Sequence, residues 1–170
     1  MNIGYFTMRM ARNATAIEEF VKHMDPGQSS WRPAPDKWSI LDVICHLYDE
    51  ERFDFRVRLE CVLEDPNKEF PKFNTLDWVT EHRYRDQDIV EMRALFCRER
   101  EKSIAWLNSL DNIDWDVAHE HPKLGRMSAG TLLGSWLAHD YLHLRQMAGL
   151  QYHYLEQLVA PHPLDYAGGW

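Results

Sequence analysis

Two histidines stand four positions apart in the stretch LAHDYLHLRQM, residues 137–147. If this segment is helical, His139 and His143 lie on one face, because residues four apart are neighbours on a helix surface. Two imidazoles placed in this way can bind one divalent ion together. The chain contains nine histidines, and chance alone gives on the order of half of one such pair. From the spacing alone, a pair of ordinary hydrogen-bonded histidines is therefore an equal alternative.

A third histidine, His46, lies early in another long helical pattern. If the two helices pack side by side, three imidazoles converge on one point. Three neutral imidazoles leave an ion its full charge and at least one open position, which is typical of catalytic sites and not of closed structural ones. The alternative is a packed histidine without a ligand role. We expect the other six histidines to be solvated or to cap helix ends: His23, His82, His119, His121, His153 and His162.

Glu50 stands one turn after His46, inside the acidic run DEE at residues 49–51. A carboxylate at this spacing can orient an imidazole or transfer a proton, and Glu50 is therefore a candidate catalytic residue. The alternative is that the whole acidic run is a solvated face of the helix.

Gln146 follows His143 by one turn and can hydrogen-bond a bound ligand, which makes it the second candidate catalytic residue. Its alternative is a surface amide or a contact between helices. Arg145 can pair with an anionic substrate, but it projects about 200° around the helix from His143. We therefore expect Arg145 to meet solvent or an acidic neighbour.

The segments that must position these side chains are helical, and no alternating strand pattern competes with them. Ser39 and Asp42 form a capping-box pattern at the start of the second helix, and Ser128 is an N-cap for the fourth. The sequence predicts an all-α fold, a four-helix bundle with long crossover loops. The expected helices cover about residues 13–24, 39–65, 87–110 and 128–150, with a short C-terminal helix at 152–159.

The length of 170 residues and the even spread of apolar side chains indicate a single domain, residues 1–170. The 19 basic and 27 acidic residues give a net charge of −8, and the basic residues are scattered. A nucleic-acid partner is not expected, because it needs a positive surface. No segment approaches the roughly 20 apolar residues of a membrane span, and the first residues lack a signal-peptide core. We expect a cytoplasmic protein with a small-molecule ligand and no membrane partner.

Taken together, the motifs resemble the DinB/YfiT-like superfamily of helical-bundle proteins over nearly the whole chain. The stretch WRPAPDKWSILDVICHLYDEE, residues 31–51, is similar to the family's tryptophan-serine helix start and its His-Leu-acidic run. The stretch GRMSAGTLLGSWLAHDYLHLRQM, residues 125–147, is similar to its closing HxxxHxxQ helix, and Trp78 stands between the two. Asp42 departs from the glutamate that relatives often carry there, which we interpret as a capping difference.

The resemblance implies a bundle that is often dimeric, with a divalent metal held by His46, His139 and His143. Zinc or nickel suits three nitrogen ligands best, although iron(II) and manganese(II) also bind such ligands. Characterised relatives carry out thiol-dependent S-transfer or isomerise maleylpyruvate-like acids. We therefore expect a metal-dependent transferase, or a related isomerase-like enzyme, that uses a low-molecular-weight thiol on an electrophilic small molecule. The alternative is a stress-response protein that binds a metal or a small ligand without turnover.

Overall fold

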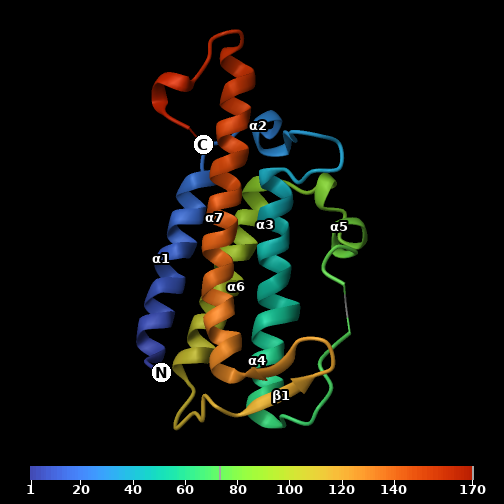
Figure 1. The fold of residues 1–170 in the computed structure, drawn as a ribbon, viewed down its shortest axis with the longest axis vertical. Helices are drawn as coiled ribbons and strands as arrows, with labels where there is room; N and C mark the ends of the chain where they lie inside the picture. Colours follow the sequence, from blue (N-terminus) through green and yellow to red (C-terminus); the bar gives the residue numbers. More distant parts are fainter. Residues whose placement is uncertain (73, 170) are drawn as a thin grey trace.

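Four long helices run along a common axis in the computed structural model, which describes residues 1–72 and 74–169 (Figure 1). The first and last run in one direction and the middle two in the other, so the chain must cross the length of the bundle between the second and third. The long helices are α1 (Ile3–Val21), the composite α3–η1–α4 (Ile40–Asp49, Glu50–Asp54 and Phe55–Glu64), α6 (Ile89–Asn108) and α7 (Ala129–Val159). The predicted all-α four-helix bundle is confirmed.

The connections, and the segment that follows α7, carry the remaining elements. These are the short helices α2 (Pro26–Ser30), α5 (Trp78–Glu81), η2 (Tyr84–Asp86) and η3 (Asp165–Ala167), and the strands β1 (Ala118–His121) and β2 (Gly125–Ser128). The two strands pair as an antiparallel hairpin with Ala118 opposite Ser128. Gly125 closes the turn at a φ of 71°, where a side chain would be strained.

The structure differs from the predicted elements in three places. The first helix begins ten residues before Asn13, because the Asn2 side chain accepts a hydrogen bond from the backbone of Tyr5 and caps it. The fourth and fifth predicted helices are one continuous helix, α7, which extends past the end of the bundle (Figure 1). The loop before Ser128 contains the β-hairpin, whose four-residue strands are too short to give a strand pattern.

The second long helix begins where the capping box predicts. Ser39 accepts a hydrogen bond from the backbone of Asp42, and the Asp42 carboxylate accepts one from the backbone of Ser39 at 2.6 Å. A π-helical turn, η1, then interrupts this helix at Glu50–Asp54. Such a turn accommodates an extra residue, shifts the phase of the helix that follows and is frequent at functional sites.

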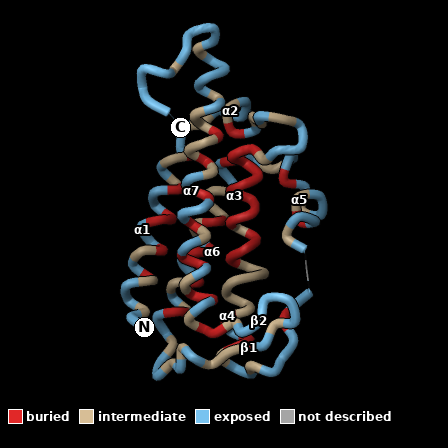
Figure 2. The backbone as a smooth tube through the Cα atoms, viewed as in Figure 1, coloured by how far each residue is buried: buried red, intermediate tan, exposed pale blue. Residues whose placement is uncertain are grey.

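Two clusters of buried apolar side chains fill the bundle, and the buried stretches of chain lie mainly in the middle of the long helices (Figure 2). The first cluster includes Ile17, Val43, Ile44, Leu47, Phe96 and Met147, and the second includes Met10, Leu59, Val62, Leu107, Leu133 and Trp136. Burial of these side chains holds the helices together through the hydrophobic effect. Among the described residues, no helix is both long and apolar enough to cross a bilayer.

Candidate metal centre

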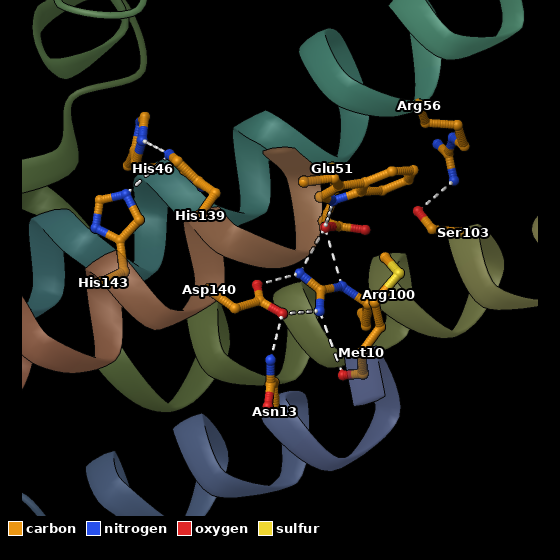
Figure 3. A network of polar contacts seen from close by, with 11 residues as sticks. Met10, Asn13, His46, Glu51, Arg56, Arg100, Ser103, His139, Asp140 and His143 are labelled. Carbon is orange, nitrogen blue, oxygen red and sulfur yellow. Dashed lines mark hydrogen bonds and ion pairs between the residues drawn. The ribbon is translucent and has the colours of Figure 1, made fainter. Parts of the chain in front are cut away.

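The three predicted histidines come together between α3 and α7, with their Nε2 atoms facing one another (Figure 3). Nε2 of His139 lies 3.4 Å from Nε2 of His46 and 3.0 Å from Nε2 of His143. One ligand atom from each of the three rings can be chosen so that all lie within 4.8 Å of one another. The helical spacing in α7 and the packing of α3 against it therefore produce the predicted cluster.

The donor set fits a divalent ion. Two nitrogens that each lie about 2.1 Å from a tetrahedral ion are roughly 3.4 Å apart, close to the separations seen here. Oε1 of Gln146 lies 2.8 Å from Nδ1 of His143, and because this oxygen only accepts, Nδ1 carries the proton and Nε2 presents a lone pair. Gln146 is half-buried and placed to orient the imidazole of a candidate metal ligand.

All three imidazoles favour the neutral form that binds a metal. Burial, and then the neighbouring histidines, lowers the pKa of His46 to about 2. Burial and His143 lower the pKa of His139 to about 3, and burial lowers that of His143 as well. Nδ1 of His46 is buried and has no hydrogen-bond partner among the described residues. Its ring is held by packing instead, with the Trp38 ring centroid 4.9 Å away.

The histidine cluster opens into a pocket of about 770 Å³. Aromatic rings from the loop before α3 and from α4 form part of its wall: Trp38 stacks parallel to His143, and the Phe55 ring lies 5.1 Å from that of His139. The pocket is lined by Trp38, His46, Glu50, Asp54, Phe55, Thr75, His139, Leu142, His143, Arg145 and Gln146. A site with ligands on one side and an open pocket on the other has room for a substrate.

Glu50 lies inside this pocket, with Oε1 3.5 Å from Nε2 of His46. The interpretation of residues 49–51 as a solvated run is wrong, because all three side chains are buried. Burial, and then the charge of Asp54, raises the pKa of Glu50 to about 9. Asp54 hydrogen-bonds Glu50 and is ion-paired with Arg58. Burial raises the pKa of Asp54 as well, so this pair of carboxyl groups keeps a proton to a higher pH than isolated carboxyl groups do.

Arg145 is exposed, as expected, yet it lines the pocket mouth. Among the residues that the structure describes, no acidic side chain pairs with its guanidinium. An arginine without a carboxylate partner beside a pocket is suited to bind an anionic group.

A buried ionic cluster lies next to the histidines and was not predicted (Figure 3). The Arg100 guanidinium, 1% exposed, donates to both oxygens of Asp140 at 2.7 and 2.8 Å and to Oε1 of Glu51 at 2.9 Å. Trp136 also donates to Glu51, and Asn13 to Asp140. The cluster ties α1, η1, α6 and α7 together and fixes the residues that follow Glu50 and His139 in the sequence.

One feature of the sequence indicates that Arg100 is buried. Arg100 lies in the buried stripe of α6, four residues after Phe96 and three before the buried Ser103, where an apolar residue is usual. Burial opposes its charge, but Glu51 and Asp140 outweigh this effect and raise the pKa of Arg100, so the guanidinium stays charged. A basic residue in an apolar stripe indicates buried acids on neighbouring helices.

Two of the other histidines are not the solvated or capping residues that we expected. His119 is buried, stacks on Phe70 at 4.2 Å and lies 2.9 Å from the carbonyl oxygen of Pro66. His82 is half-buried and contacts the buried Asp49. Neither belongs to the three-histidine cluster.

Known proteins resemble this chain in sequence family and in fold. A family model of the DinB superfamily matches residues 9–147. No curated protein matches the chain. The structure is similar to that of YfiT from Bacillus subtilis, described as a probable metal-dependent hydrolase with an unusual four-helix bundle topology. That match has a TM-score of 0.78 and 16% identity, and it covers 89% of this chain and 87% of YfiT. With most of its length matched by the family model, the chain belongs to the DinB superfamily.

Proposed function

We propose that the protein is a metal-dependent enzyme in which a water molecule or a low-molecular-weight thiol attacks an electrophilic small molecule. The observation that carries this proposal is the convergence of three neutral imidazoles in the lining of an open pocket. A structural metal site closes its coordination with protein ligands, whereas a catalytic site leaves a position for water or substrate. Zinc or nickel is the ion that we propose for three nitrogen ligands.

His46, His139 and His143 would hold the ion through their Nε2 atoms. When bound, such an ion supplies positive charge that lowers the pKa of water or of a thiol toward neutrality. The burial that keeps the three rings neutral also removes the competition with protons that weakens metal binding at low pH.

Glu50 is the residue that we propose to move the proton. It holds a proton at neutral pH while no cation is near, because burial disfavours its charge. It becomes ionised when a divalent cation lies beside it, since a nearby positive charge favours the carboxylate. Glu50 then accepts the proton of the nucleophile at Oε1 and returns it to the leaving group.

The pocket walls indicate what the electrophile looks like. Trp38, Phe55 and Leu142 supply apolar surface, which excludes water and accommodates a carbon skeleton. Among the described lining residues, Arg145 is the only lysine or arginine, and it would orient an anionic group of the substrate. We therefore propose an apolar molecule with a single anionic group.

The choice between hydrolysis and S-transfer depends on the nucleophile. YfiT, described as a probable hydrolase, favours water, and the resemblance of the sequence motifs favours a thiol. Both reactions use the same residues in this pocket, so a single experiment can separate them.

That experiment uses protein loaded with one equivalent of zinc or nickel. Hydrolysis is followed with nitrophenyl esters in the absence of thiol, and S-transfer with chlorodinitrobenzene or an epoxide in the presence of cysteine or glutathione. We expect turnover in one of the two assays, lost in His139→Ala and kept in His153→Ala, whose histidine is exposed on the same helix. Metal binding without turnover in either assay would favour the non-enzymatic alternative.

A further inference from the structure

His82 and Asp49 form a second oriented pair outside the metal centre. Nδ1 of His82 lies 2.7 Å from Oδ2 of Asp49, whose side chain is almost fully buried. The hydroxyl group of Tyr84 donates to the same oxygen at 2.7 Å. Burial and Asp49 raise the pKa of Tyr84 above its ordinary value, so the phenol stays a donor. Asp49 thus accepts from both neighbours.

This arrangement fixes the tautomer of the neutral imidazole. Because Asp49 is an acceptor, the proton of a neutral His82 resides on Nδ1, and Nε2 presents a lone pair. Among the described residues, no group donates a hydrogen bond to Nε2. A buried carboxylate that orients a histidine leaves the opposite nitrogen ready to accept a hydrogen bond from a ligand.

The loop around His82 is held in place by features that a surface histidine does not need. The next residue, Arg83, has a left-handed backbone with a φ of 50°, which is uncommon for a residue with a side chain. The Gln87 side chain donates to the carbonyl oxygen of His82 at 2.9 Å. Trp78 stacks against the imidazole with an angle of 14° between the planes. Backbone strain of this kind clusters at functional sites.

His82 lines a cavity of about 350 Å³ together with Phe53, Val57, Pro71 and Trp78. Among the residues that the structure describes, none lines both this cavity and the metal pocket. Its volume lies within the range of small-molecule sites, and His82 is its only polar lining side chain among the described residues. Arg52 stacks on the Phe53 ring at 4.4 Å but does not line the cavity, so a charged ligand has no counter-ion there.

We propose that the cavity beside His82 binds a small planar aromatic molecule that carries one hydroxyl group. The ring packs against Phe53 and Trp78, which favour aromatic partners. The hydroxyl group donates to Nε2 of His82. An apolar ligand of the same shape would leave this nitrogen without a partner. We therefore expect the ligand with the hydroxyl group to bind more tightly than the same ligand without it.

The test compares p-cresol with 4-methylanisole, in which a methyl group replaces the hydroxyl proton. Dissociation constants are measured by saturation-transfer NMR at about pH 8, above the range in which free imidazole is protonated. We expect wild-type protein to prefer p-cresol roughly fivefold, the effect of one net hydrogen bond. His82→Phe keeps the aromatic packing without the acceptor and is expected to bind both probes equally.

His153→Phe is the matched control, because His153 also places Nδ1 2.8 Å from a carboxylate, that of Glu156, but lines none of the cavities described here. We expect it to keep the preference for p-cresol. The ¹⁵N signal of Nε2 of His82 should shift with p-cresol and not with 4-methylanisole, which tests the contact without any substitution. Equal affinity of wild-type protein for the two probes, binding of neither, or a preference that survives in His82→Phe would overturn the proposal.

Discussion

Oε1 of Glu50 lies 3.5 Å from Nε2 of His46, so a carboxyl group with a raised pKa and a candidate metal-binding imidazole line the same pocket. Glu50→Gln removes the proton transfer and preserves the size of the side chain. We expect kcat/KM to fall about 10²- to 10⁴-fold while one metal ion per chain is retained. Glu60→Gln, at an exposed position of α4, is the control. Full activity in Glu50→Gln would remove Glu50 from the mechanism.

Arg145 at the mouth of the pocket should set the affinity for an anionic substrate. We expect Arg145→Ala to raise KM for such a substrate about tenfold, the effect of one charge-assisted hydrogen bond, and to leave metal affinity unchanged. Steady-state kinetics with a carboxylate substrate and its amide measures this difference. Arg98→Ala, which changes another exposed arginine, should leave KM unchanged. An equal rise in KM for the amide would show that Arg145 acts through packing and not through charge.

The depressed pKa values of His46 and His139, about 2 and 3, make the metal-free protein sensitive to acid. The unfolded chain protonates both imidazoles near pH 6.5, whereas the folded chain does not. The unfolded state therefore binds more protons from about pH 6.5 down to about pH 3, and the free energy of unfolding falls as pH falls. Each histidine contributes a slope of about 1.4 kcal/mol per pH unit once pH is well below 6.5.

His139→Gln should reduce this slope by about that amount, and urea unfolding of metal-free protein from about pH 5.5 to about pH 4 measures it. His153→Gln, at an exposed position, should leave the slope unchanged. An identical slope in the wild type and in His139→Gln would mean that His139 is protonated in the folded protein.

The Arg100 cluster should be essential for stability. Arg100→Met leaves Glu51 and Asp140 buried without a counter-charge, and breaking such a cluster costs about 3–5 kcal/mol. Chemical denaturation measures the loss, with Arg98→Met as the exposed control on the same helix. A loss no greater than that of the control would mean that water reaches the two carboxylates.

The local signals in the sequence predicted the elements well. The capping box of Ser39 and Asp42 and the N-cap Ser128 predicted helix starts that the structure confirms. Such signals depend on residues three apart, which the sequence displays directly. The early start of α1 was missed because two of its buried positions, Thr7 and Asn13, are polar and interrupt the apolar stripe. The hairpin was missed because its strands are short.

The site was predicted in part. The i,i+4 spacing placed His139 and His143 on one face, but the approach of His46, 93 residues away, came from the family resemblance and not from spacing. The contacts of Arg100 with residues 40 and 49 positions away, and of His82 with Asp49, depend on how the helices pack. Sequence periodicity describes one helix at a time, so it cannot assign partners between helices.

The central claim is that His46, His139 and His143 hold one divalent ion. Its most direct test is the metal content of purified protein after incubation with zinc or nickel and removal of free ion. It is measured by mass spectrometry for the wild type, His139→Ala and the control His153→Ala. We expect one ion per chain in the wild type and in the control, and none in His139→Ala. A wild type without metal, or a His139→Ala variant that keeps a full equivalent, would contradict the claim.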